Sequence, residues 1–133
     1  MNNYTELLRA HHLKATPQRL EITNALHTYG HMNIENLYAM MLEKFNSISL
    51  ATIYKNINIM LEASFIQEVK IPDAKSVFEL TKASHSHAVC SNCGYIEDIT
   101  LDLSSIQNVA MDITDFQIET SDLVFSGLCK KCQ

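Results

Sequence analysis

The sequence predicts an α+β fold built from two small modules. Up to residue 62 the apolar positions recur at helical spacing, whereas short apolar runs with strand-like alternation dominate afterwards. Charge also changes along the chain. Residues 1–75 hold seven basic and seven acidic side chains, while residues 76–133 hold three and eight, so the second part carries the whole net charge of −5. We expect modules at residues 1–80 and 81–133.

Four helices are expected in the first module. The first spans residues 3–12, and the fourth ends near residue 62. The second, third and fourth helices are each expected to begin after an N-cap residue, whose side chain accepts a hydrogen bond from a backbone N–H of the first turn. The predicted N-caps are Thr16, Asn33 and Ser49. Pro17 suits the first position of the second helix, and Gly30 ends that helix because glycine readily adopts the left-handed conformation of a C-terminal cap.

Two extended runs follow the fourth helix, at residues 65–71 and 77–80, and the turn between them indicates a hairpin. The fourth helix has an apolar stripe, and its opposite face carries hydrogen-bonding groups instead of the Glu/Lys pairs of a solvated surface. Helices followed by a two-stranded hairpin are the layout of a winged helix-turn-helix DNA-binding domain. The alternative is a helical module that only packs on the second half. Neither half is basic, so charge gives no support for nucleic acid.

The second module is predicted to be a small α/β domain. Its expected elements are strands at residues 87–89, 95–100 and 116–125 and one helix at residues 103–111. A sheet of this size with a single helix rarely stands alone. Its apolar face is therefore expected to pair with a second copy of the chain, which makes this module a dimerisation domain.

All four cysteines fall in two pairs, Cys90-x-x-Cys93 and Cys129-x-x-Cys132, separated by 35 residues. A two-residue spacer lets both thiolates of a pair reach one ion, so two such pairs predict a tetrahedral structural zinc clasp. A redox pair or free buried thiols are the alternatives. No apolar run reaches 18 residues and the N-terminus lacks the order of a signal peptide, so we expect a cytoplasmic protein, where reduced thiols prefer metal to disulfide.

Four blocks of sequence stand out together, and they are Thr16–Arg19, Ala51–Asn56, His85–Gly94 and Cys129–Cys132. In this order they resemble the ferric uptake regulator (Fur) superfamily of dimeric, metal-dependent bacterial repressors. The resemblance covers essentially the whole chain. It implies a homodimer that binds double-stranded operator DNA.

The resemblance also implies a regulatory metal between the modules, with ligands at His31, Glu79, His85, His87 and Asp98. Imidazole and carboxylate without thiolate suit Fe(II), Mn(II) or Zn(II), and five such ligands favour iron or manganese over tetrahedral zinc. Alternation places Asp98 on the same face as Ile96, which is unusual for a carboxylate that is merely solvated. Taken alone, His31 is more often a turn histidine and Glu79 a solvated strand carboxylate.

Two features bear on the signal that is sensed. Iron-sensing members commonly read His-His-Asp-His before the first cysteine pair and build a further site from the extra histidine and aspartate, but this chain has Ser84 and Ser86 there. Peroxide-sensing members usually have aspartate at both carboxylate ligands, and this chain has Asp98 but Glu79. The resemblance therefore implies a peroxide-responsive repressor, with an iron or zinc uptake regulator as the alternative.

By the same resemblance, the fourth helix enters the major groove, with Tyr54 against a thymine. Near the start of the second helix, basic side chains hold the DNA backbone or reach a minor groove. The residues expected to contact DNA are Lys14, Arg19, Thr52, Tyr54, Lys55 and Asn56.

The implied release mechanism is oxidation of a ligand histidine, His31 or His85, when peroxide reacts at regulatory Fe(II). A third possibility is a non-haem iron enzyme that uses the same histidines and carboxylates. The sequence offers no nucleophile or cofactor loop to accompany such a centre, so we expect no enzyme.

Overall fold

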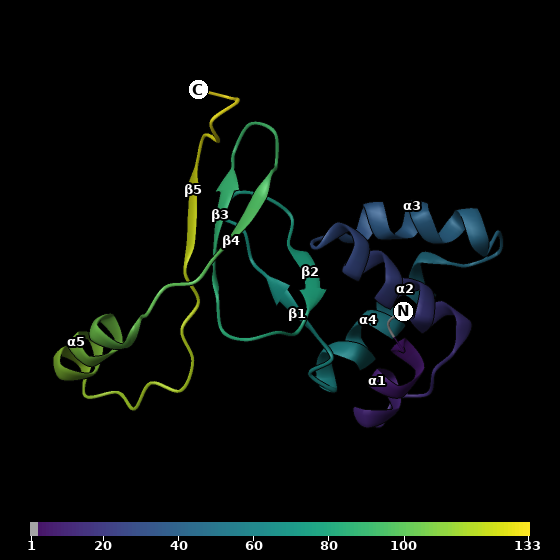
Figure 1. Ribbon diagram of the computed structural model, residues 1–133, viewed down its shortest axis with the longest axis horizontal. Helices are drawn as coiled ribbons and strands as arrows, with labels where there is room; N and C mark the ends of the chain where they lie inside the picture. The colour runs from purple at the N-terminus through teal and green to yellow at the C-terminus, as the bar shows by residue number, and fades with distance from the viewer. Residues whose placement is uncertain (1–2) are drawn as a thin grey trace. The chain divides into compact units, whose positions relative to one another are not determined.

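The computed structural model describes residues 3–133, and the chain forms two compact units that divide between Lys82 and Ala83. Both units combine helix and strand, so the predicted α+β class is confirmed. Figure 1 shows the order of the elements along the chain. Within the described residues, none of the helices is long and apolar enough to cross a membrane.

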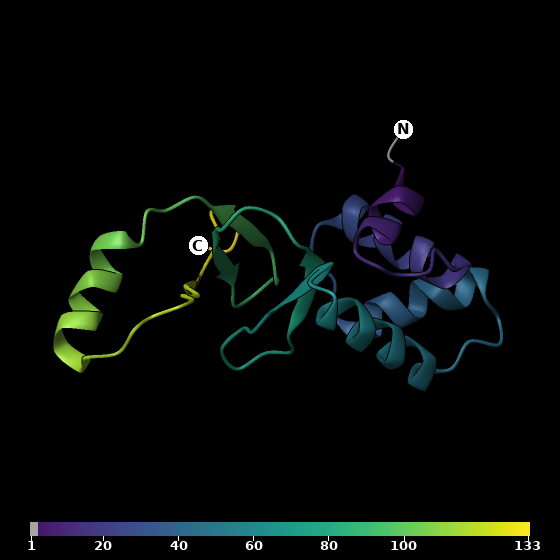
Figure 2. The ribbon, with the colours of Figure 1, turned by 90° about the horizontal axis from the view of Figure 1, so that it is seen from below.

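The first unit consists of four helices and a hairpin. Its elements are α1 (Tyr4–Ala10), α2 (Pro17–Tyr29), α3 (Ile34–Lys44), α4 (Leu50–Glu62), β1 (Ile66–Val69) and β2 (Val77–Leu80). The helices, purple to teal in Figure 2, gather around one another beside the hairpin. This is the predicted series of elements, with each boundary within a few residues of the expected one.

Local hydrogen bonds set the helix starts as predicted. The backbone N–H groups of Arg19, Asn36 and Thr52 donate to the side chains of Thr16 at 3.3 Å, Asn33 at 2.8 Å and Ser49 at 3.1 Å. At the other end of α2, Gly30 has a φ of 80°, a backbone conformation that residues other than glycine adopt only with strain.

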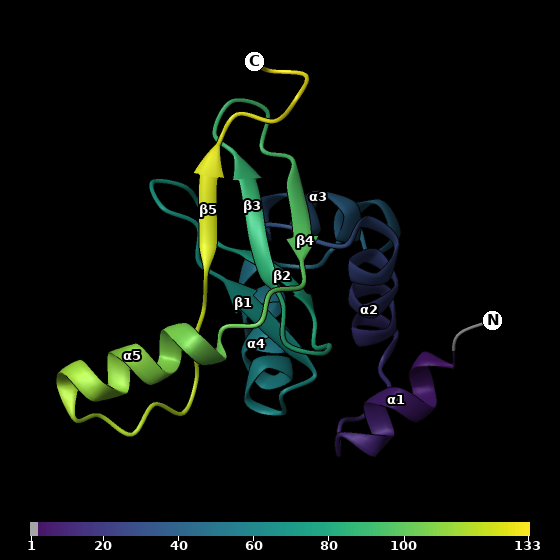
Figure 3. The ribbon, with the colours of Figure 1, turned by 60° about the vertical axis from the view of Figure 1, so that its left-hand side comes forward.

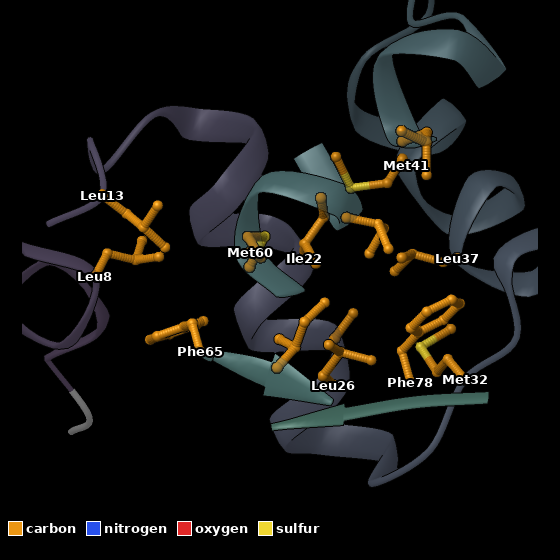
Figure 4. Close-up of a cluster of buried hydrophobic side chains, with 14 residues drawn as sticks. Leu8, Leu13, Ile22, Leu26, Met32, Leu37, Met41, Met60, Phe65 and Phe78 are labelled. Carbon is orange, nitrogen blue, oxygen red and sulfur yellow. The ribbon is translucent and has the colours of Figure 1, made fainter. Parts of the chain in front are cut away.

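A single apolar core holds the first unit together. Figure 4 shows side chains of α1, α2, α3 and α4 meeting Phe65 and Phe78 from the hairpin side of the unit in this core. Its largest fully buried side chains are Leu8, Ile22, Leu26, Leu37, Met41, Ile53, Ile57, Met60 and Ile66. Each such side chain stabilises the fold by roughly 1.5–3 kcal/mol relative to exposure, so this unit has a substantial core of its own.

The hairpin pairs antiparallel, with Gln67 directly opposite Glu79. The loop before α3 joins the other edge of β2, because Met32 and Phe78 form an antiparallel bridge with N–H to O distances of 3.1 and 2.8 Å. In an antiparallel pair the residue before Met32 falls opposite the residue after Phe78. His31 is therefore placed across from Glu79.

The second unit is a three-stranded sheet with one helix. Its elements are β3 (Ser86–Cys90), β4 (Ile96–Ile99), α5 (Ser104–Thr114) and β5 (Val124–Gly127). The strand order is β4-β3-β5, with β4 antiparallel and β5 parallel to β3, and Figure 3 shows β3 in the centre.

The predicted long strand at residues 116–125 is wrong, because the only strand in that region is β5 and it begins at Val124. Its pairing with β3 starts at His87 opposite Val124 and ends at Cys90 opposite Gly127. A strand needs a neighbour to receive its backbone hydrogen bonds. Because β3 itself begins at Ser86, the segment before Val124 would run past the start of its neighbour.

Helix α5 has no buried residue. Figures 1 and 3 show it beyond the ends of the strands of its own unit, not over a face of the sheet. Its apolar side chains recur at helical spacing and stay in solvent, with exposed fractions of 63% for Ile106, 58% for Val109 and 76% for Ile113. An exposed apolar stripe of this kind is typical of a protein interface.

Candidate metal centres

The four cysteines converge at one end of the second unit. The first pair begins at the last residue of β3 and the second pair follows β5, and the parallel pairing of these strands brings both pairs to the same end of the sheet. The four sulfur atoms all lie within 4.8 Å of one another, and Sγ of Cys93 is 3.7 Å from Sγ of Cys129. Tetrahedral zinc with bonds of about 2.3 Å requires sulfurs roughly 3.8 Å apart. The cysteine cluster therefore fits one tetrahedral ion.

The two residues between Cys90 and Cys93 donate hydrogen bonds to the second cysteine pair and to the strand before it. The backbone N–H and the hydroxyl of Ser91 both donate to the carbonyl of Gly127, at 2.7 and 3.1 Å. The side-chain amide of Asn92 donates to Sγ of Cys132 at 3.3 Å. These contacts join the two pairs in addition to any ion that the four sulfurs share.

The thiols of the cluster differ in acidity. Backbone N–H groups of Cys129 and then Cys93 lower the pKa of Cys90 to about 6. The Asn92 amide also lowers the pKa of Cys132, but the neighbouring thiols of Cys129 and Cys90 outweigh it and raise that pKa to about 11. Four thiolates cannot share this space without a cation, whereas a bound metal ion deprotonates coordinating thiols outright.

The five predicted regulatory ligands fall into two groups, one in each unit. In the first unit, Nε2 of His31 lies 2.7 Å from Oε2 of Glu79. Glu79 is only 1% exposed, and its other oxygen, Oε1, accepts a hydrogen bond from the Gln67 side chain at 2.7 Å. A buried carboxylate beside an imidazole is therefore already in place in this unit.

In the second unit, two imidazoles converge on one carboxylate. Strand pairing puts His87 opposite Asp98, and the Nε2 atoms of His87 and His85 lie 3.4 and 3.7 Å from Oδ1 of Asp98. Nδ1 of His85 donates to the carbonyl of Ala83 at 2.9 Å, which leaves Nε2 with the lone pair that a metal requires. Ligands on one ion, at about 2.0–2.2 Å from it, lie roughly 3 Å apart. Both groups fit such spacing.

Four of the predicted DNA-contacting residues, Thr52, Tyr54, Lys55 and Asn56, lie on α4, whereas Lys14 precedes α2 and Arg19 lies in its first turn. Tyr54 is 46% exposed, and Lys55 and Lys14 are exposed as well. Arg19 and Asn56 instead contact each other, since Nε of Arg19 donates to Oδ1 of Asn56 at 3.1 Å. The sequence pattern did not predict this bond between α2 and α4.

Two further contacts complete this surface. The Arg19 guanidinium also donates to the carbonyl of Lys14 at 3.2 Å, so it spans the start of α2. The Asn56 amide donates to the carbonyl of Thr52 at 3.1 Å. Arg19 and Asn56 therefore link the start of α2 to α4 through one set of hydrogen bonds.

The sequence model of the ferric uptake regulator family matches residues 10–126, and the chain belongs to this family. The match confirms the resemblance drawn from the four sequence blocks.

Named relatives are regulators of the peroxide response. The chain is 31% identical over 129 residues to the peroxide operon regulator of Bacillus subtilis, covering 96% of this chain and 89% of that protein. It is 32% identical over 128 residues to the peroxide-responsive repressor PerR of Staphylococcus saprophyticus, covering 95% and 86%.

Solved structures agree on the fold. The Campylobacter jejuni peroxide stress regulator is 32% identical, with a TM-score of 0.73 over 98% of this chain and 100% of that chain. The Vibrio cholerae ferric uptake regulator is 29% identical, with a TM-score of 0.77 over 96% and 100%. The predicted similarity to peroxide-sensing members is thus confirmed at the level of relatives.

Proposed function

We propose that this protein is a cytoplasmic, metal-dependent transcriptional repressor that binds operator DNA as a homodimer and releases it when peroxide oxidises its regulatory iron site. The observation that carries the proposal is the convergence of His85 and His87 on Asp98. It gives a nitrogen and oxygen ligand set in a family whose named relatives here respond to peroxide.

The first unit is the DNA reader in this proposal. Its helices followed by the β1–β2 hairpin match a winged helix-turn-helix, in which α4 is the recognition helix. Tyr54 and Lys55 project from α4 into solvent, where they can meet a base and a phosphate. Arg19 and Asn56 are hydrogen-bonded to each other. We therefore propose that they hold α4 in its orientation relative to α2, in addition to contacting the DNA backbone.

The second unit provides the zinc clasp and the dimer interface. Cys90, Cys93, Cys129 and Cys132 hold structural Zn(II), whose size and preferred geometry match their spacing. The apolar stripe of α5, led by Ile113 at 76% exposed, supports pairing with a second copy of this chain.

Regulation depends on one ion held jointly by the two ligand groups. His31 and Glu79 come from the first unit, and the remaining ligands, His85, His87 and Asp98, come from the second. An ion bound to both groups restricts how the units move and so favours one DNA-binding arrangement. Fe(II) held by these residues would reduce peroxide and so supply an oxidant strong enough to modify an imidazole, whereas Mn(II) in the same set would react with peroxide much less. An oxidised His31 or His85 is a poorer ligand, so the restraint is lost.

An iron or zinc uptake regulator is the second candidate, and Glu79 favours it because peroxide-sensing members usually have aspartate at that position. The serines at positions 84 and 86 favour the first candidate, since they replace the histidine and aspartate of the further iron site. An enzyme would need a substrate pocket beside open metal positions, and the sequence offers no nucleophile or cofactor loop to accompany such a centre.

A DNA-shift assay with and without Mn(II) tests the repressor proposal. We expect the zinc-loaded protein to retard its operator only when Mn(II) is added, and Asp98→Ala to fail to retard it with or without Mn(II). Retardation that is the same with and without Mn(II) in wild type would refute metal-dependent repression.

A further inference from the structure

Glu79 occupies the centre of a row of three residues that crosses the first unit's small sheet. Gln67 is directly opposite Glu79 on β1. On the other side of β2, the bridge between Met32 and Phe78 places His31 across from Glu79. Side chains that lie opposite one another in a sheet project from the same face. The three polar groups therefore meet on one face.

The two oxygens of Glu79 have different neighbours within this row. Oε1 accepts a hydrogen bond from Nε2 of Gln67 at 2.7 Å, whereas Oε2 lies 2.7 Å from Nε2 of His31. Glu79 is 1% exposed, so its orientation depends on protein groups rather than on bulk water. The Gln67 amide N–H must be the donor in this bond, because the Glu79 carboxylate accepts hydrogen bonds and does not donate them.

We propose that Gln67 is a positioning residue for the regulatory metal, and that its amide holds Oε1 so that Glu79 presents Oε2 as the single ligating atom. The inference rests on the proposed function, because it requires Glu79 to be a ligand. Hydrogen-bonded partners of metal ligands fix ligand orientation, and their removal typically weakens metal binding by about 10–100-fold. Gln67 meets this description, although it touches no metal itself.

The competing explanation is that Gln67 only satisfies a buried carboxylate and so stabilises the fold. The two explanations differ in what is lost when the amide is removed. If Gln67 only stabilises the fold, removing its amide lowers the unfolding temperature of the metal-free protein and leaves the affinity of the folded protein for metal unchanged. If Gln67 positions Glu79, removing its amide lowers that affinity at temperatures where the protein is fully folded.

The experiment is a titration of zinc-loaded, full-length protein with Mn(II), followed by the electron paramagnetic resonance signal of the free ion. Gln67→Met keeps the approximate size of the side chain and removes the donor. We expect its Kd for Mn(II) to rise about 10–100-fold. Gln67→Asn withdraws the amide by one methylene and should also weaken binding, and it decides the matter if the methionine variant does not fold. Glu68→Gln, at the next and exposed position of β1, is the matched control and should bind as wild type does.

Glu79→Gln separates this inference from the function on which it rests. If wild type fails to bind Mn(II), or if Glu79→Gln binds it equally well, the proposed ligand set is wrong. If Glu79→Gln binds more weakly while folded Gln67→Met and Gln67→Asn keep the wild-type Kd, the ligand set stands and the positioning role of Gln67 is overturned.

Discussion

Replacing one cysteine of the cluster is expected to unfold the second unit and leave the first unit folded. Cys132→Ser removes one of four thiolate ligands and the acceptor of the Asn92 amide. We expect the variant to lose zinc and its dimer together, because α5 and β5 belong to the same unit as the cluster.

The size of the effect follows from how little apolar burial the second unit has. In residues 83–133 the buried apolar side chains are Val89, which contributes roughly 1.5–3 kcal/mol at most, and Cys90, which belongs to the cysteine cluster. Structural zinc contributes on the order of 10 kcal/mol of folding free energy in small zinc domains. Losing the ion therefore removes more than the apolar contacts of this unit supply. The first unit keeps its own core and should unfold in a separate transition.

The assay combines zinc content, native mass and thermal unfolding followed by circular dichroism. The matched control is Lys130→Gln, a change between the two cysteines of the second pair that leaves all four thiols in place. This variant should retain its zinc, its dimer and a folded second unit. Wild type stripped by a chelator should behave like Cys132→Ser. A Cys132→Ser protein that lacks zinc yet remains dimeric, with a cooperatively folded second unit, would show that the zinc reasoning is mistaken.

Three smaller perturbations probe other parts of the account. Thr16→Ala removes the N-cap of α2 and should lower the free energy of unfolding of the first unit by about 1 kcal/mol in denaturant titrations, whereas an unchanged midpoint would contradict the cap. Tyr54→Ala should weaken operator binding by about 1–3 kcal/mol with zinc content and dimer unchanged, and equal affinity across a salt series would exclude α4 as the reader. Hydrogen bonds from the Ser104 hydroxyl and N–H hold the pKa of Asp102 below its ordinary 3.8, so the charged form stabilises the folded state above that pH and this stabilisation is lost as the pH falls through the lowered pKa. Asp102→Ala should therefore lower the unfolding temperature more at pH 7 than at a pH below the lowered pKa, and an equal effect at both would rule out this origin.

Features that depend on adjacent residues could be predicted from the sequence. Thr16, Asn33 and Ser49 cap their helices because each bond spans only three residues, and the hairpin follows from its turn. The clustering of the four cysteines was predictable from their spacing, because two C-x-x-C motifs that include every cysteine of the chain are typical of a zinc site.

Features that depend on distant partners could not be predicted in this way. The alternation at residues 116–123 indicates a strand, but no strand forms before Val124 because β3 is too short to pair with it. The bond between Arg19 and Asn56 joins positions 37 residues apart, and neither residue type indicates it. Gln67 was missed although counting across the hairpin turn would have paired it with Glu79. His31 carries no local signal of ligation, and only the family resemblance singled it out.

The most direct test of the central claim compares the Fe(II) and Mn(II) forms of the same zinc-loaded protein after brief exposure to peroxide. Operator binding is measured by DNA shift, and the peptides containing His31 and His85 are measured by mass spectrometry. We predict that the Fe(II) form loses operator binding and gains one oxygen atom on one of these peptides, while the Mn(II) form does neither. If both forms keep the operator and neither histidine gains oxygen, the protein is a sensor of metal concentration and Glu79 is the more informative ligand.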